Sequence, residues 1–209
     1  MKKLVFTMYC IFMSVSVFAQ NNITWEGQIG LNVAKLTHYE SLIGYNLGVR
    51  AKMELPVENL YVNMGALLSR KGASFDLGEA GNTKIKANYL DIPVHVGYQY
   101  VVNNDFSVFG EFGPYFAIGL FGKSKGMEGD INDEGDVLQS PISYNTFDQF
   151  KRFDFGLGLR VGTEIKKKYI LAFSYDFGFI NGWKSYQEEN DWTASCKNRN
   201  FSISLGYKF

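Results

Sequence analysis

The sequence predicts an all-β protein, an eight-stranded antiparallel up-and-down transmembrane β-barrel preceded by a cleavable signal peptide. Three observations support this prediction. Eight segments alternate between apolar and polar residues, the period of a β-strand with two different faces. The segments are long enough for strands that cross a bilayer, which need roughly 9–11 residues. The links between them alternate between short and long, as in outer-membrane barrels.

The first 19 residues are typical of a secretory signal peptide. Residues 1–3 give a positive start, residues 4–18 are mostly apolar, and small residues precede the expected cleavage after Ala19. We therefore assign residues 1–19 to the signal peptide and 20–209 to one barrel domain. Cleavage would leave Cys196 as the only cysteine, so we expect no internal disulfide.

Four alternating segments lie in the N-terminal half, at residues 23–33, 43–55, 60–70 and 89–100. In the first, the odd positions are apolar or glycine and the even positions are mostly polar. In the second, every odd residue from Ile43 to Leu55 is apolar, and every even residue is polar, charged or glycine. The third and fourth place their apolar residues on even positions, as at Val62 and Leu90.

Four more segments follow, at residues 106–120, 153–165, 169–179 and 200–209. In the segment 106–120, Val108 and Phe112 lie on the apolar side. In the other three segments the odd positions are mostly apolar or aromatic, and the last of them is Phe209. Pro93 and Pro114 lie inside two predicted strands, where each removes a donor from the ladder. We expect these two prolines to mark β-bulges.

The chemistry of the two faces predicts their orientation. One face carries almost no charge along the strand centres, so we expect it to meet lipid, where a Lys or Arg at mid-bilayer costs about 2–4 kcal/mol. The other face gathers ionisable residues of both signs, and eight strands leave a lumen just wide enough for side chains. We expect these residues to form a polar network with no open pore. They are Glu26, Arg50, Lys52, Glu54, Asp91, His95, Glu111, Asp154, Arg160, Glu164 and Asp176.

The links and the aromatic residues predict which end of the barrel is which. The short links, at residues 56–59, 101–105 and 166–168, are expected in the periplasm, with both termini. The long links, at residues 34–42, 71–88, 121–152 and 180–199, are expected outside the cell. The periplasmic aromatic girdle would comprise Trp25, Tyr98, Tyr100, Phe106, Tyr169, Tyr207 and Phe209, and the outer one Phe116, Phe153, Phe177, Phe179 and Trp183.

Composition argues against several classes of function. The formal net charge is +0, which gives no electrostatic case for nucleic acid. No apolar run of 18 residues follows the signal peptide, so we expect no helical span. We predict no catalytic, cofactor-binding or metal-binding residues and no enzyme activity, since no G-x-S-x-G motif is present.

Three features of the sequence bear on this expectation. His95 should face the lumen beside Asp91. It is either a polar core residue or, together with a serine, part of a hydrolase site. The other histidine, His38, lies in the first long link. The acidic loop 128–136 matches the first half of a calcium loop, but Pro141 stands where such a loop has Glu, so a solvated loop and weak divalent binding both stay open. The basic run 166–168 suits a solvated turn, with lipid-phosphate contact as the alternative.

The stretch 88–94, preceded by 68–72, resembles the PorT-like outer-membrane β-barrel family of Bacteroidetes. Residues 18–20, around the expected cleavage point, are similar to the signal-peptide ends of that group. The resemblance covers the chain from the first predicted strand to Phe209. It implies an eight-stranded barrel in the outer membrane, inserted by the barrel-assembly machinery. One branch of the family is linked to protein secretion.

We therefore expect an outer-membrane barrel with an occluded polar lumen and a structural or interaction role at the cell surface. Its expected partners are outer-membrane lipids, lipopolysaccharide and, through the extracellular loops, other envelope proteins. Two alternatives stay open. One is an enzyme that modifies outer-membrane lipids. The other is a soluble lipocalin-like carrier of a small apolar ligand, in which apolar residues would face inward and polar residues outward.

Overall fold

The computed structural model describes residues 23–36, 40–76, 82–131, 137–182 and 197–209. Within these residues the chain forms nine strands and one short helix. In chain order they are β1 (Ile23–Leu36), β2 (Glu40–Glu54), β3 (Leu60–Asp76), β4 (Asn82–Asn103), β5 (Phe106–Ile131), β6 (Val137–Asn145), α2 (Thr146–Gln149), β7 (Phe153–Ile165), β8 (Tyr169–Gly178) and β9 (Asn198–Lys208). No helix among the described residues has the length and apolarity that a membrane-spanning helix needs.

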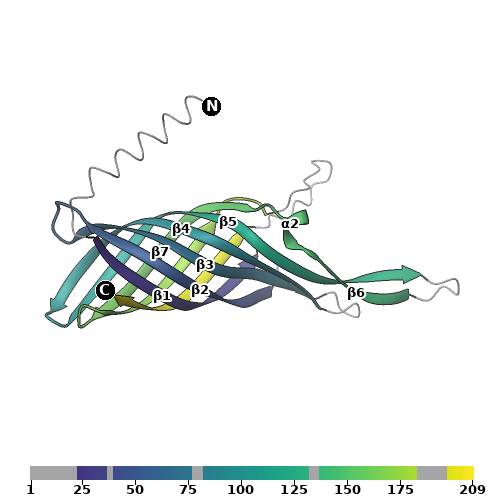
Figure 1. Cartoon of the computed structure of the whole chain (residues 1–209), viewed down its shortest axis with the longest axis horizontal. Coiled ribbons are helices and arrows are strands. Elements are labelled where there is room, and N and C mark those ends of the chain that lie inside the picture. Colours follow the sequence, from purple (N-terminus) through teal and green to yellow (C-terminus); the bar gives the residue numbers. More distant parts are fainter. Residues whose placement is uncertain (1–22, 37–39, 77–81, 132–136, 183–196) are drawn as a thin grey trace, which may run out of the picture.

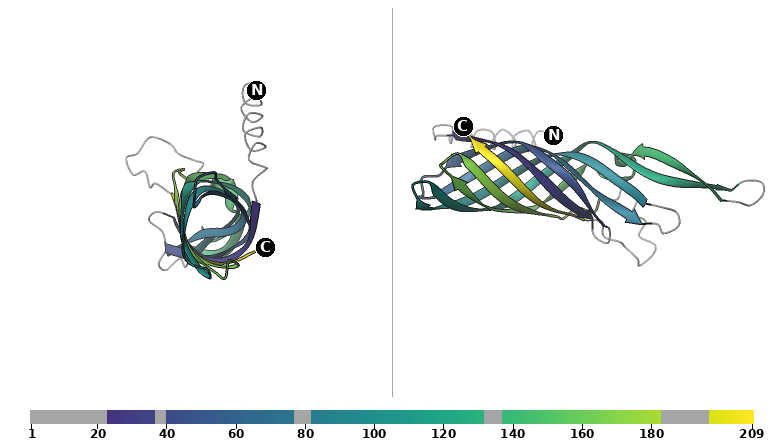
Figure 2. Two further views of the ribbon diagram at one scale, coloured as in Figure 1. Left: turned by 90° about the vertical axis from the view of Figure 1, so that its left-hand side faces the viewer. Right: turned by 90° about the horizontal axis from the view of Figure 1, so that it is seen from below.

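Eight of the nine strands form a closed antiparallel barrel. Each pairs with its neighbour along the chain, β5 pairs with β7, and the ring closes where β1 pairs with β9. Figure 2 shows this ring seen along the barrel axis. Closure gives every strand two neighbours, which is how a sheet satisfies its backbone groups in lipid. The predicted eight-stranded barrel is therefore confirmed.

β6, the strand outside the ring, was not predicted, because residues 121–152 were expected to form a long link. β5 does not end near Leu120 but continues to Ile131, where β6 pairs back against it outside the ring. β3 and β4 are also longer than predicted. β3 continues to Asp76, and β4 already begins at Asn82. Sequence reasoning missed these extensions because they lie beyond the apolar band, where no lipid selects for period-2 alternation.

Pro93 and Pro114 do not mark bulges, contrary to the prediction. The β4–β5 ladder is interrupted after Pro93, but its register is the same on both sides of the interruption. The flanking pairs are Pro93↔Tyr115 and Val96↔Phe112. Pro114 itself pairs with Leu157 in an unbroken β5–β7 ladder. The β4–β5 register shifts instead at Asn88/Tyr89, where Leu120 is the extra residue of β5, and again at Val101/Asn103 beside the turn. The prolines therefore interrupt the ladder locally without displacing it.

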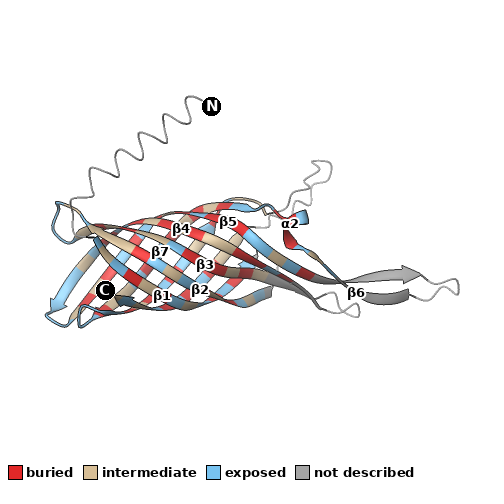
Figure 3. Cartoon of the chain, viewed as in Figure 1, coloured by how far each residue is buried: buried red, intermediate tan, exposed pale blue. Residues whose placement is uncertain are grey.

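The two faces of the barrel have the predicted orientation. Apolar side chains such as Leu47, Leu159 and Leu205 are exposed on the outside, while Glu26 and Arg160 are buried in the interior. Figure 3 shows buried and exposed residues alternating along the strands. A lipocalin-like carrier needs the opposite arrangement, so this structure argues against that alternative.

The short turns lie at one end of the barrel and the β5–β6 hairpin at the other (Figure 1). The beginning of β1 and Phe209 lie at the end with the turns. Exposed aromatic residues surround this end, among them Trp25, Tyr100 and Tyr169. Phe116, Phe153, Phe177 and Phe179 are exposed nearer the hairpin, whereas Trp183 lies outside the described residues.

Candidate functional site

The centre of the lumen is occupied by one arginine between two carboxylates. Arg160 of β7 contacts Glu26 of β1 at 2.6 Å and Glu111 of β5 at 3.1 Å, and its side chain is 1 % exposed. Glu111 also accepts hydrogen bonds from Tyr61 and Asn63 of β3. Inward-facing positions of four strands thus converge on one buried ion cluster, as predicted for the inner face.

A second arginine begins a chain of amide side chains that runs along the barrel wall. Arg50 Nε donates to Gln28 Oε1 at 2.7 Å, and Gln28 Nε2 donates to Asn46 Oδ1 at 2.7 Å. Asn46 Nδ2 in turn donates to Asn32 Oδ1 at 2.6 Å. Because each amide both donates and accepts, the chain ties β1 to β2 through the interior as well as through the backbone ladder.

The half of the lumen nearer the hairpin contains more carboxylates than cations. Lys71 pairs with Asp91 at 2.9 Å, and both side chains are buried. Asp154 accepts hydrogen bonds from the Tyr115 hydroxyl and the Asn198 amide, and Asp176 accepts one from Asn200. Neutral donors therefore satisfy the carboxylates that have no ion-pair partner of their own.

His95 faces the lumen as predicted and lines the same small cavity as Asp91, but its nearest charged partner is Glu111. Its Nδ1 lies 3.8 Å from Glu111, while Lys71 holds the carboxylate of Asp91. Neither ring nitrogen forms a hydrogen bond within the described part of the chain. His95 thus lacks the contact with a serine hydroxyl on which nucleophilic hydrolysis depends.

The lumen is closed to solutes. The cavities between the described polar side chains are small, about 40 Å³ beside Lys71 and Asp154, about 30 Å³ beside His95 and Asp176, and about 20 Å³ beside Arg160 and Glu164. These volumes hold single water molecules. These small interior cavities therefore form neither a continuous channel nor a chamber for a small organic ligand.

The short helix α2 closes the lumen at the hairpin end. Phe147 is 1 % exposed and packs edge-to-face on Tyr89 at 5.7 Å, over Gly119, whose missing side chain leaves room for the ring. Thr146 donates to the backbone oxygen of Lys86 and contacts the Ser124 hydroxyl. Sequence reasoning missed this plug because four residues of helix carry no periodic signal.

The opposite mouth is wider and lined with charge. A cavity of about 450 Å³ opens there between the turns. At its rim Lys208 pairs with Glu164 at 2.9 Å, and Lys52 donates to Gln99, which bonds Ser107. The basic run 166–168 forms the tight turn that was predicted, with positive φ at Lys166 and Lys167.

Several predicted features fall outside what the structure describes. The signal peptide, His38 and Cys196 lie in undescribed segments, as do residues 132–136 of the acidic loop. The preceding residues of that loop, up to Ile131, belong to β5. Among the described residues, no group of three or more His, Cys, Asp or Glu side chains could hold a metal ion.

A closed barrel with an apolar exterior and a plugged polar interior defines an integral outer-membrane protein. The chain belongs to the outer membrane protein beta-barrel domain family, whose model matches residues 18–182. The protein therefore resides in the outer membrane, embedded in its lipids.

Solved structures of similar proteins come from several bacteria. Neisserial surface protein A is 11% identical with a TM-score of 0.48, and the match covers 90% of this chain and 97% of that one. Ail of Yersinia pestis is 16% identical with a TM-score of 0.42, over 90% and 99% of the two chains. A major outer membrane protein from Thermus thermophilus is 18% identical with a TM-score of 0.47, over 90% and 99%. No curated protein matches the chain.

Proposed function

We propose that this protein is a non-catalytic membrane anchor that presents the β5–β6 hairpin to other envelope proteins at the cell surface. The observation that carries the proposal is the length of β5. Its 26 residues far exceed the roughly 9–11 that a strand needs to cross the bilayer. A barrel that served only as a closed structural unit would not need this extension.

The geometry of the hairpin suits contact with a protein. From Gly126 to Ile131, β5 pairs with β6 and with no other described strand. Six residues at about 3.4 Å each carry the ribbon roughly 20 Å beyond its last contact with β4. Figure 1 shows this ribbon projecting from the barrel. A two-stranded ribbon has unpaired backbone groups on its outer edges, to which an extended partner segment can add as a further strand.

The closed lumen supports an anchor over a transporter or an enzyme. Arg160, Glu26 and Glu111 occupy its centre, and Phe147 blocks one mouth. The hairpin would face outward, because barrels of this kind keep short turns in the periplasm and longer connections outside. An enzyme acting on lipid is not favoured, since His95 has no hydroxyl partner in the described structure.

The resemblance of residues 88–94 to PorT-like barrels supports a more specific role. We place the chain in that family of Bacteroidetes, with insertion by the barrel-assembly machinery and an accessory role in protein secretion. The resembling stretch lies in β4 at the register shift beside Tyr89, next to the α2 plug and the base of the hairpin. The envelope partner would then contact the same end of the barrel.

Deleting the tip of the hairpin tests the proposal. In the deletion variant, a Gly-Gly link replaces residues 127–141. In both this variant and the full chain, a photo-crosslinking residue replaces Lys125. We expect both to fold and stay in the outer membrane, and we expect the full chain alone to give a discrete crosslinked product in intact cells. The matched control carries the crosslinker at Asp105, in the opposite turn.

Two results would contradict the proposal. One is the same crosslinked product from the deleted chain, which would place the partner elsewhere. The other is steady ion conductance of the purified protein in planar bilayers, which would mean that the lumen opens and that the barrel transports.

A further inference from the structure

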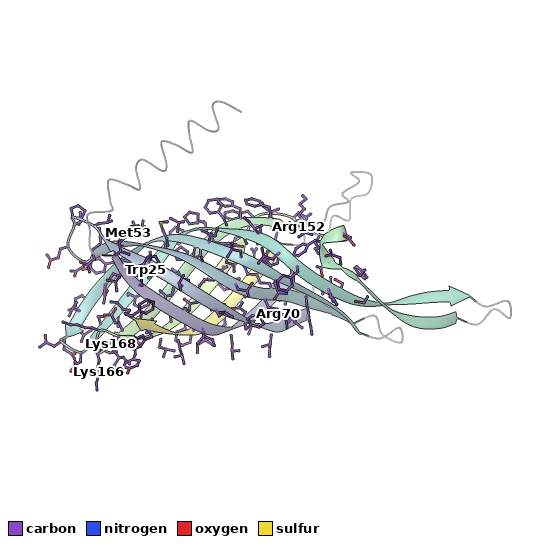
Figure 4. All side chains as sticks on the ribbon, viewed as in Figure 1. Trp25, Met53, Arg70, Arg152, Lys166 and Lys168 are labelled. Atoms are coloured by element: carbon purple, nitrogen blue, oxygen red, sulfur yellow. The ribbon has the colours of Figure 1, made fainter. Side chains whose placement is uncertain are left out.

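Six basic residues point outward near the hairpin end of the apolar band. We call them the cationic collar; they are Lys35, Arg70, Lys86, Lys123, Arg152 and Arg199. They come from β1, β3, β4, β5, β9 and the segment before β7, so they are spread around the barrel. Figure 4 shows two of them, Arg70 and Arg152, toward the hairpin end and away from Lys166 and Lys168 at the turn end.

Two pairs of collar residues stand directly opposite each other on neighbouring strands. Lys86 of β4 pairs in register with Lys123 of β5, and Lys35 of β1 pairs with Arg199 of β9. Like charges at directly opposed positions destabilise a sheet. An anion placed between the two members of a pair would reverse this repulsion.

The described contacts of the three arginines orient their guanidinium groups and include no carboxylate. Arg199 lies 3.4 Å from the ring centroid of Phe177 and donates to the Gly178 carbonyl. Arg152 donates to the carbonyls of Gly119 and Leu120. These neighbours orient the guanidinium groups without neutralising them.

Arg70 is oriented in the same way. It lies over Tyr45 at 5.1 Å and donates to Asn88 at 3.4 Å. Among the side chains that the structure describes, no carboxylate forms an ion pair with any member of the collar. One exposed acid with a described side chain, Asp148 on α2, lies at this end of the barrel. No ion pair joins it to a described side chain of the collar.

The position of the collar fits a lipid headgroup. Phe121, Phe153 and Phe177 are exposed beside it, and such aromatic residues mark the boundary between hydrocarbon and headgroups. The turn end differs, because exposed Glu58 and Asp105 accompany the lysines there. A row of six cations just beyond the apolar band, accompanied by one exposed acid with a described side chain (Asp148), is complementary to a leaflet of anionic headgroups.

We propose that the cationic collar binds the phosphate groups of lipopolysaccharide in the outer leaflet. The acyl chains would lie along the apolar face, next to Leu90 and Ile118, and each phosphate would bridge opposed cations such as Lys86 and Lys123. This site does not depend on the protein partner of the hairpin, and deletion of the hairpin tip leaves it intact.

The test compares lipopolysaccharide with the same material after enzymatic removal of its lipid phosphates. Affinity for the full chain in detergent is measured by native mass spectrometry. The collar variant is Arg70→Gln/Lys86→Gln/Lys123→Gln, and the matched control, Lys166→Gln/Lys167→Gln/Lys168→Gln, removes the same charge at the turn end. Because each cation contributes roughly fivefold to affinity, we expect the collar variant to bind lipopolysaccharide about a hundredfold more weakly. The affinity of the control should be nearly unchanged.

Further variants and probes keep the result decisive. Lys86→Arg/Lys123→Arg keeps the charge and should bind like the parent chain. If the triple variant fails to fold, Lys35→Gln/Arg199→Gln tests the opposite side of the collar and should also weaken binding. Equal affinity for dephosphorylated lipopolysaccharide, equal loss in both triple variants, or equal affinity for phosphatidylglycerol vesicles would overturn the proposal.

Discussion

Leu159 and Arg160 are neighbours in β7, yet they occupy opposite environments. Leu159 is 50% exposed on the outside of the barrel, while Arg160 is 1 % exposed at the centre of the lumen. In a soluble protein this arrangement would be inverted, with the leucine inside. The comparison shows that the membrane reverses the usual assignment of the faces, because the solvent of the outer face is hydrocarbon.

The two faces also tolerate change for different reasons. An outward side chain meets fluid lipid, so its polarity matters more than its shape. An inward side chain must fit between fixed neighbours and satisfy their hydrogen bonds, so both its shape and its charge matter. Three neighbouring positions in β7, Gly158, Leu159 and Arg160, allow each requirement to be tested separately.

The largest effect is expected at Arg160. Arg160→Met leaves Glu26 and Glu111 buried without their shared cation, which should lower the free energy of unfolding by about 3–5 kcal/mol. Urea unfolding in lipid vesicles, followed by tryptophan fluorescence, measures this loss. Adding Glu26→Gln and Glu111→Gln to the variant should restore much of the stability. An unchanged urea midpoint for the single variant would mean that the ion cluster contributes little.

A smaller effect is expected one residue away, on the outer face. Leu159→Arg places a charge near the middle of the lipid-facing side of β7 and should cost about 2–4 kcal/mol. The measurement is the fraction of protein that shows the folded, heat-sensitive mobility on a gel after insertion. Leu159→Phe is the control and should insert normally. Normal insertion of the arginine variant would argue that this face does not meet hydrocarbon.

The smallest effect is expected for two glycines on opposite faces. A Cβ at Gly158 would lie 2.8 Å from His95 Nε2, whereas one at Gly110 would have no heavy atom within 4 Å. Gly158→Ala should therefore lower the free energy of unfolding by about 1–3 kcal/mol through overpacking. Gly110→Ala should be neutral or slightly stabilising.

A double-mutant cycle sharpens this glycine comparison. Replacing His95 with Ala removes the nearest atom that the new Cβ would meet and leaves Asp176 Oδ1 at 3.1 Å, so Gly158→Ala should cost less in that background. Both variants are measured by the same urea unfolding. Equal costs at Gly158 with and without His95 would assign the effect to strand propensity instead of packing in the lumen.

Much of this fold could be predicted from residues 23–209, because period-2 alternation is a local property. The alternation in residues 43–55 and 200–209 predicted strand, face and approximate bounds together. The plug at Phe147 and the extension of β5 were not predicted. Neither lies in a repeating pattern, and each depends on surfaces that exist only after the barrel has closed.

The alternation of residues was enough to predict that charged side chains gather in the lumen and apolar ones meet lipid. It could not determine that Arg160 would lie between Glu26 and Glu111, or that Lys86 would face Lys123. Arg160 and Glu26 are 134 residues apart in the chain. The stagger of the closed ring brings them together, and that stagger is set jointly by all the strand pairs. For this reason the side of the sheet that each residue occupies can be predicted one residue at a time, whereas the pairing of charges arises only in the assembled barrel.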